Sequence, residues 1–323
     1  MDGDTMTLQN TSALVDATGI NNGLVHTPVT PFNDDETIDY DTLGKVLDFH
    51  QGQQPGAIAL HLDAGERYSL RDDERKELVE FAVKRVVPTP VLVDVTVPGT
   101  AVAASLASHA QQAGAAGVIV TTPYFYRPPE DMLVEHFRQI AAATDLAVLL
   151  YSSPRTNKGG VGITQPMVEE LIDLSPNVVG FIDGSLSWPN FMWLRKATLE
   201  KNPSFVMLPD AEYLSTSMTI GADGALSPLS AIIPGALGEL YALCRDQRFN
   251  EARSLQQRVG QVSLLVRNTG ASLPASIKAA MEILGRPTGT TRGPNLPLGA
   301  EETERLRAGL TELNVIGTEP EGW

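Results

Sequence analysis

Cysteine is nearly absent from this sequence, since Cys244 is the single one in 323 residues. No disulfide can therefore form within the chain, and no Cys/His spacing typical of a structural zinc site occurs. The first segment, Met1–Ile20, lacks both the cationic start and the apolar centre of a signal peptide. These absences predict a cytoplasmic protein that begins with a partly flexible N-terminal extension over residues 1–20.

Basic residues are also scarce. The chain has 24 Lys and Arg against 39 Asp and Glu, which gives a formal net charge of -15. Nucleic-acid binding needs a basic surface that neutralises phosphates, so nucleic acid is not an expected partner. No run of about 18 uncharged apolar residues occurs, so no membrane span is expected.

Eight short apolar runs are present, each followed by a segment of helical composition. β-rich runs that alternate with amphipathic helices indicate parallel βαβ units, and eight in succession predict a closed (β/α)8 barrel. The alternative is a doubly wound open sheet, but no glycine-rich dinucleotide fingerprint supports it. The predicted strands lie within Gly23–Thr30, Ala57–Ala64, Pro90–Thr96, Gly117–Pro123, Ala147–Ser153, Val178–Asp183, Phe205–Asp210 and Gly224–Leu229.

The predicted domain organisation is a barrel over residues 21–233 followed by a helical region, 234–323, packed on it. No linker typical of a domain boundary separates the two. The predicted helices are Tyr40–Gln51, Asp72–Arg85, Thr100–Ala113, Pro129–Ala143, Gln165–Leu174, Asn190–Glu200, Ala211–Ile220, Pro234–Cys244, Phe249–Arg267, Leu273–Leu284 and one near Glu301–Leu313.

Several motifs occur in one order along this predicted barrel. They are VHTPVTPF, GERYSL with RDDER, TTPYFYRPP, YSSPRT, GADGALS, and SIKAAMEILG with TRGPNLPL. Over roughly residues 23–298 the chain resembles the dihydrodipicolinate synthase and N-acetylneuraminate lyase family. The resemblance implies a TIM barrel, usually tetrameric, that adds or removes pyruvate-like units through a Schiff base on a lysine of the sixth strand. A homo-oligomer, dimer or tetramer, and a small oxoacid ligand are therefore expected.

The segment NVVGFIDGS departs from this pattern, because Ile182 stands where the resemblance implies the lysine. Isoleucine can neither form an imine nor donate a proton. The family's strand-five tyrosine corresponds to Tyr151, which could transfer a proton to or from a substrate oxygen. A packed ring whose hydroxyl bonds to backbone is the structural alternative for Tyr151.

The family's loop after the second strand corresponds to residues 62–66. Strand alternation predicts that His61 and Asp63 share one face, about 6 to 7 Å apart, so that His61 could be a second base. The backbone N–H groups of Ala64 and Gly65 could hold a substrate carboxylate without help from a side chain. A histidine buried among neighbours is the structural alternative for His61.

Four further positions are candidates near the mouth of the barrel. Asp94 replaces a glycine of the family pattern, and Phe125 stands where a second tyrosine is often found. Arg155 could receive a substrate carboxylate through a bidentate contact, and Lys158 could swing in to form a relocated imine.

No cofactor is expected. The alternative is a divalent metal held by His61, Asp63, Glu66 and Asp94, although their spacing matches no recognised ligand pattern.

Two functions remain open from the sequence. The first is a lyase that acts on a small oxoacid, by aldol cleavage, hydration or dehydration, without the strand-six imine and with Tyr151 as acid or base. The second is a catalytically inactive relative that binds a ligand or regulates an active homologue.

Overall fold

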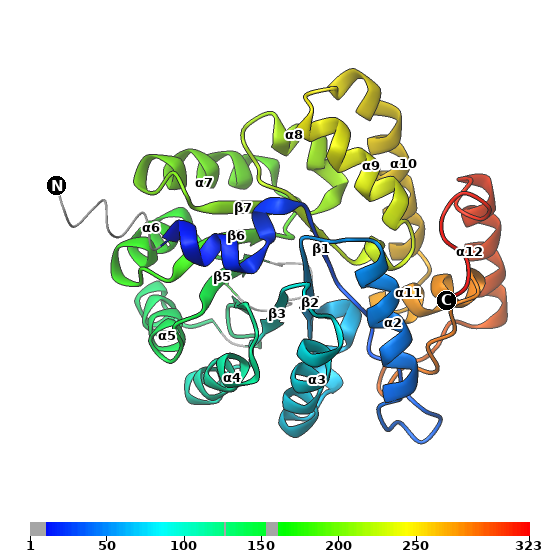
Figure 1. Cartoon of the computed structure of the whole chain (residues 1–323), viewed down its shortest axis with the longest axis horizontal. Helices are drawn as coiled ribbons and strands as arrows, with labels where there is room; N and C mark the ends of the chain where they lie inside the picture. Colours follow the sequence, from blue (N-terminus) through cyan, green and yellow to red (C-terminus); the bar gives the residue numbers. More distant parts are fainter. Residues whose placement is uncertain (1–10, 126, 153–160) are drawn as a thin grey trace.

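The structure is a computed structural model that describes residues 11–125, 127–152 and 161–323. Eight parallel strands form one sheet in the order β7-β6-β5-β4-β3-β2-β1-β8, and a parallel bridge between Asp210 and Leu226 brings its two edges together. The result is a (β/α)8 TIM barrel with additional C-terminal helices (Figure 1), as predicted.

Every predicted strand is present within its predicted run. All eight strands are buried along their whole length, because the barrel interior covers one face and the helices cover the other. Burial on both faces explains why the strands read as continuous apolar runs. They are β1 Leu24–His26, β2 Ala57–Leu60, β3 Val91–Asp94, β4 Gly117–Thr121, β5 Ala147–Ser152, β6 Val178–Asp183, β7 Val206–Pro209 and β8 Ala225–Ser227.

The predicted helices are also present, with ends that differ by at most two residues. The exception is Ala211–Ile220, which divides into the 3₁₀-helix η4, Ala211–Tyr213, and the short helix α8, Leu214–Met218. The other helices are α2 Tyr40–Gly52, α3 Asp72–Arg85, α4 Thr100–Ala113, α5 Glu130–Ala142, α6 Gln165–Leu174, α7 Trp188–Lys201, α9 Pro234–Arg245, α10 Phe249–Arg267, α11 Leu273–Ile283 and α12 Ala300–Glu312. Four short 3₁₀-helices complete the description: η1 Ile20–Asn22, η2 Asp63–Gly65, η3 Arg67–Ser69 and η5 Pro228–Ala231.

Residues 11–18 form a helix that lies across the barrel (Figure 1), where only a flexible extension was expected. Val15 and Ile20 are buried in the cluster that fills the barrel interior. Gly19 has a φ of 67° and approaches the backbone so closely that a Cβ would lie 2.2 Å from the carbonyl oxygen of Gly56. This helix lies at the amino ends of the strands, so residues 11–20 are part of the packed structure.

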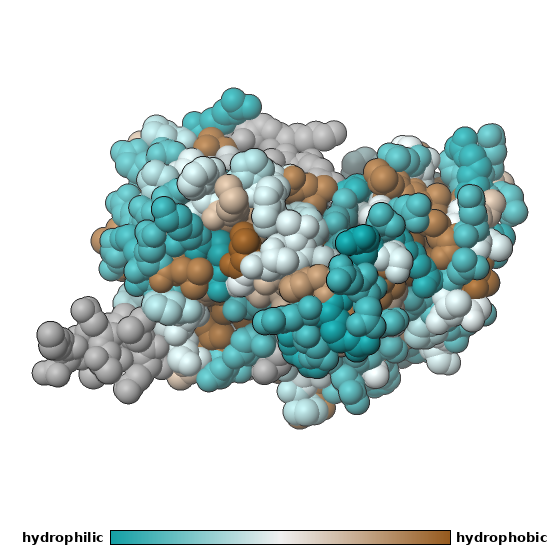
Figure 2. All heavy atoms as spheres, turned by 90° about the horizontal axis from the view of Figure 1, so that it is seen from above, coloured by the Kyte–Doolittle hydropathy of each residue, from teal (hydrophilic) through white to brown (hydrophobic). Residues whose placement is uncertain are grey.

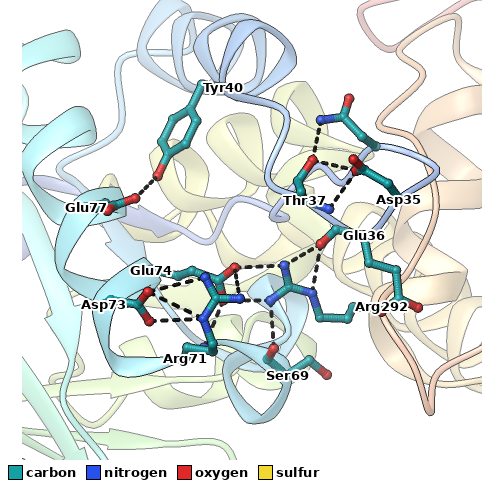
Figure 3. Close-up of polar contacts among 11 residues, drawn as sticks. Asp35, Glu36, Thr37, Tyr40, Ser69, Arg71, Asp73, Glu74, Glu77 and Arg292 are labelled. Atoms are coloured by element: carbon teal, nitrogen blue, oxygen red, sulfur yellow. Dashed lines mark hydrogen bonds and ion pairs between the residues drawn. The ribbon is translucent and has the colours of Figure 1, made fainter.

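The C-terminal segment is tied to the barrel by Arg292, which belongs to the TRGPNLPL motif. Its guanidinium donates to both oxygens of Glu74, at 2.7 and 2.9 Å, to the Ser69 carbonyl at 2.9 Å and to the Glu36 carbonyl. Figure 3 shows Arg292 between these groups, with Arg71 on the far side of Glu74. This ion-pair network joins three segments that are far apart in the sequence.

The outer surface is mainly hydrophilic in the view from above (Figure 2), with apolar residues scattered among polar ones. In the part of the chain that the structure describes, no helix combines the length and hydrophobicity needed to cross a membrane.

Two buried histidines make the fold sensitive to acid. The Nδ1 atoms of His26, on β1, and His50, on α2, lie 3.2 Å apart. Burial lowers the pKa of His26 from 6.5 to about 4, and burial together with His26 holds the pKa of His50 well below its ordinary value. Both rings are therefore neutral in the folded state over a pH range in which they are protonated in the unfolded chain.

We expect the free energy of unfolding to be at its full value above pH 6.5 and to fall as the pH drops toward about 4, because only the unfolded state takes up the protons. His26 alone accounts for a loss of about 2 kcal/mol between about pH 7.5 and pH 5, at 1.36 kcal/mol per pKa unit. Urea unfolding at both pH values measures this loss. His50→Leu should reduce the difference, whereas His109→Leu, which replaces a histidine on the helix surface beside Glu80, should leave it unchanged.

Candidate functional site

A cavity of about 210 Å³ opens at the carboxyl ends of the strands. Its wall combines strand ends, the loops that follow β1, β2 and β7, and residues of α10 and α11. In TIM barrels the carboxyl ends of the strands carry the active site. This cavity is therefore the candidate site, and its size suits a small metabolite better than a drug-sized ligand.

Tyr151 and Ile182 lie side by side in the wall. They are register partners on β5 and β6, and both belong to the cluster inside the barrel. Ile182 is 1% exposed, so its side chain fills the space beside the phenol ring. Gly184 allows the backbone to pass close by, because a Cβ there would lie 3.1 Å from the Tyr151 hydroxyl.

His61 does not point into the cavity. β2 ends at Leu60, and His61 has a φ of 62°, in the left-handed region that non-glycine residues rarely adopt. Strand alternation holds only while the backbone stays extended, so the expectation that His61 and Asp63 share a face is wrong. His61 is buried beside Arg75, and burial followed by this charge holds its pKa well below the ordinary value.

Asp63 does line the cavity, and its charge is balanced by Arg67. One terminal nitrogen of Arg67 lies 3.2 Å from Asp63 Oδ1, and the other lies 2.8 Å from Asp94 Oδ2. Asp94 is fully buried, accepts the Thr96 N–H at 2.8 Å, and is not among the residues that line the cavity. The Arg67 guanidinium therefore stands between two carboxylates that the sequence suggested as joint ligands.

The predicted metal donors do not converge. Asp63 and Asp94 share Arg67, His61 faces Arg75, and Glu66 is 2.7 Å from the Nζ of Lys278. Within the described ranges, no three His, Cys, Asp or Glu side chains are grouped in a way that could hold a metal ion. These residues do not fit a metal site, and no chemistry is assigned to one.

Lys278 is a lysine near the strand ends that the sequence interpretation missed, although it lies in the SIKAAMEILG motif. Its Nζ donates to Glu66 Oε1 and to the Thr290 carbonyl, both at 2.7 Å. Burial lowers its pKa, while Glu66 opposes that shift. Lys278 is not part of the cavity wall, so it holds α11 against the β2 loop.

Of the two residues expected to cradle a carboxylate, only Ala64 lines the cavity. The Gly65 N–H donates to the Leu62 carbonyl at 2.9 Å, and the Gly65 carbonyl accepts the Thr30 hydroxyl at 2.8 Å. Gly65 thus stabilises the turn that presents Ala64.

Phe125 lies outside the cavity and is 84% exposed, with an edge-to-face contact to Tyr124. Arg155 and Lys158 lie outside the described residues.

An ion pair between Glu212 and Arg267 forms part of the wall, and nothing in the sequence singled it out. The Arg267 guanidinium makes a bidentate contact with Glu212, at 2.5 Å for one of the two bonds, and the Ser263 hydroxyl donates to the same carboxylate at 2.7 Å. Glu212 belongs to η4 and Arg267 to the end of α10. The pair therefore joins the loop after β7 to the C-terminal helices across the mouth of the cavity.

A family model described as the dihydrodipicolinate synthetase family matches residues 21–313 of this chain. A 4-hydroxy-tetrahydrodipicolinate synthase from Methanothrix thermoacetophila is 30% identical over 288 residues, which cover 88% of this chain and 95% of that protein. The same enzyme from Gluconacetobacter diazotrophicus is 28% identical over 299 residues, 91% of this chain and 97% of that one.

Solved structures of related proteins have the same fold. YagE from E. coli K12, a prophage protein of the dihydrodipicolinic acid synthase family in complex with pyruvate, superposes with a TM-score of 0.86 at 26% identity, covering 91% of this chain and 98% of YagE. Dihydrodipicolinate synthase from Aquifex aeolicus superposes with a TM-score of 0.84 at 25% identity, covering 91% and 98% of the two chains.

Proposed function

Because this chain belongs to the dihydrodipicolinate synthetase family, we propose that it is an aldolase-type lyase that acts on a small oxoacid in the cavity at the strand ends. The observation that carries this proposal is the cavity at the strand ends, whose wall contains the Tyr151 phenol. The relatives named as synthases and the pyruvate complex of YagE support an oxoacid as the ligand class.

In this proposal Tyr151 transfers a proton to or from the substrate oxygen or the reacting carbon. Asp63, which also lies in the wall and is paired with Arg67, supports this proton transfer through its negative charge. The Ala64 N–H holds the substrate carboxylate. His61 has no part in this mechanism, because it is buried and does not line the cavity.

The reaction proceeds without an imine on β6, since Ile182 occupies the position that the resemblance assigns to the lysine. Among the described residues, no lysine lines the cavity. A positioned acid or base contributes about 10²- to 10⁴-fold, which does not replace a covalent electron sink for unactivated pyruvate. The substrate therefore supplies its own activation, as a β-dicarbonyl compound or a preformed imine does.

We expect Tyr151→Phe to lower turnover by about 10²- to 10⁴-fold, because the variant keeps the ring and loses the transferable proton. Oxoacid affinity should change little. The measurement is the release of pyruvate from candidate aldol adducts, alongside ligand binding by calorimetry. Tyr241→Phe on α9, outside the cavity wall, is the matched control and should retain full turnover. Unchanged turnover in Tyr151→Phe would show that Tyr151 does not transfer the proton.

A second candidate function is a barrel that binds an oxoacid without converting it. The observation that favours it is the small number of acid and base groups left at the site: His61 is turned away, and Asp63 is paired with Arg67. Binding without any turnover, in wild type as well as in Tyr151→Phe, would support this function over the lyase.

We also propose that the chain assembles with copies of itself through the surface around Phe125. Phe125 is 84% exposed, and its ring contacts Tyr124, which in turn contacts Tyr68, itself 49% exposed. An aromatic cluster of this kind is typical of a protein interface. Light scattering of the wild type and of Phe125→Glu tests this, and equal masses at the monomer value would contradict it.

A further inference from the structure

Part of the cavity wall is apolar, and it is formed by residues of β8, η5, α10 and α11. Leu226 lies on β8 and Leu229 on η5 directly after it, Val266 lies on α10, and Leu273 begins α11. Ile182 and Leu62 continue this surface on the barrel side. A ligand that reaches beyond the neighbourhood of Tyr151 and Ala64 therefore meets hydrocarbon.

Each carboxylate of the same wall has a partner on at least one oxygen, but Asp183 Oδ2 is buried and has no hydrogen-bond partner among the described residues. Asp63 is paired with Arg67, and Asp210 accepts the Glu212 N–H at 3.0 Å. Glu212 is held by Ser263 and Arg267, and Asp183 accepts the Ser185 N–H at 2.8 Å. A polyhydroxylated substrate would need some of these acceptors for its hydroxyl groups. Asp183 Oδ2 could accept one such hydroxyl, whereas hydroxyls placed beside Val266 and Leu273 would be buried without hydrogen bonds, which is unfavourable.

A second carboxylate on the substrate is disfavoured as well. Arg267 is the one cation among the described residues of the wall, and it already forms the bidentate contact with Glu212. A distal substrate carboxylate bound to Arg267 would lie close to the carboxylate of Glu212. The two negative charges would repel each other.

We propose that the substrate of this site is an oxoacid whose substituent is a branched aliphatic or aromatic hydrocarbon group, selected by Leu226, Leu229, Val266 and Leu273. This inference rests on the proposed function and names its substrate class. The carboxylate and the reacting carbon lie at the end of the cavity formed by Tyr151 and Ala64, and the hydrocarbon group extends toward α10 and α11. In hydrophobic pockets, each additional buried methylene group favours a ligand by about 10- to 200-fold.

The test is a binding series on the full-length protein by calorimetry. The ligands are pyruvate, 4-methyl-2-oxopentanoate, phenylpyruvate, 2-oxoglutarate and a 2-oxo-3-deoxy sugar acid. We expect at least one of the two hydrocarbon-substituted acids to bind more than about tenfold tighter than pyruvate, with 2-oxoglutarate and the sugar acid binding more weakly than either.

Variants locate the selecting surface. Leu273→Asn should weaken the preferred hydrocarbon-substituted acid by about tenfold or more while affecting pyruvate less. If Leu273→Asn does not fold, Val266→Thr serves in its place. It replaces one methyl group by a hydroxyl with almost the same shape, and it should also weaken the binding of the hydrocarbon-substituted acid. The matched control is Leu264→Asn, because Leu264 is exposed on the outer side of α10.

The outcomes separate this inference from the proposed function. Tighter binding of 2-oxoglutarate or the sugar acid overturns the hydrocarbon substituent and leaves an oxoacid site in place. Equal affinity for pyruvate and the hydrocarbon-substituted acids would likewise overturn the hydrocarbon substituent and leave the oxoacid site in place. If none of the five acids binds, both the substrate class and the oxoacid function are wrong.

Discussion

Arg67→Met is expected to destabilise the protein by up to about 3 to 5 kcal/mol, because it removes the nearer counter-charge of the buried Asp94 carboxylate and leaves only Arg75, at 3.7 Å. The Arg67 side chain is 1% exposed, and it bridges Asp94, which is fully buried, and Asp63 in the cavity wall. Methionine replaces most of the volume, so the loss measures charge pairing more than packing. The measurement is urea unfolding followed by circular dichroism, with thermal unfolding as a second readout.

The neighbouring helix offers a matched control for this prediction. Arg71→Met removes an arginine that is 67% exposed and paired with the exposed Asp73, and it should cost less than about 1 kcal/mol. Combining Arg67→Met with Asp94→Asn should recover part of the loss, since asparagine still accepts the Thr96 N–H and no longer buries a charge. A single variant as stable as wild type would show that Asp94 is satisfied in some other way.

Ile182→Lys is expected to let the site form an imine with pyruvate that borohydride can trap, whereas the wild type forms none. The new amine would lie beside Tyr151 in a wall position that is 1% exposed. Burial lowers the pKa of a lysine, so a larger fraction is the neutral amine that attacks the pyruvate ketone and loses water to form an imine. Borohydride then reduces the imine to a stable adduct. Peptide mass analysis should find this adduct at position 182 in the variant and at no lysine in the wild type.

The same substitution should lower thermal stability, because it places a charged or desolvated amine in an apolar wall. Leu264→Lys, on the outer side of α10, is the control and should give neither the adduct nor the loss of stability. A wild-type adduct on Lys158 or another lysine would contradict the imine-free mechanism. An unlabelled but folded variant would show that position 182 does not meet the substrate carbonyl.

The strands and helices could be read from the chain with small errors. Short runs buried on both faces and amphipathic helices are local patterns, and a few neighbouring residues suffice to specify them. Helix α3, for example, begins at Asp72 and ends at Arg85, as predicted from the helical composition of this segment. The place of Tyr151 and Ile182 at the ends of their strands followed from the same reasoning.

His61 shows where this local reasoning stopped. Counting alternate residues along β2 placed His61 beside Asp63, but one left-handed residue after Leu60 turns the side chain toward α3. His61 is 3% exposed, and the left-handed backbone at this residue was not foreseen from the alternation of the strand. No pattern within β2 itself carries this information.

The residue types at the strand ends, including the isoleucine at position 182, are properties of the chain alone. The wall opposite them depends on packing. Glu212 and Arg267 are 55 positions apart, and they meet because α10 lies against the loop after β7. Short-range periodicity specifies which face of an element is buried, whereas contacts between distant segments depend on how complete elements pack. For this reason the place of Tyr151 and Ile182 in the cavity wall could be predicted, whereas the position of His61 outside it and the apolar residues of α10 and α11 became visible in the folded barrel.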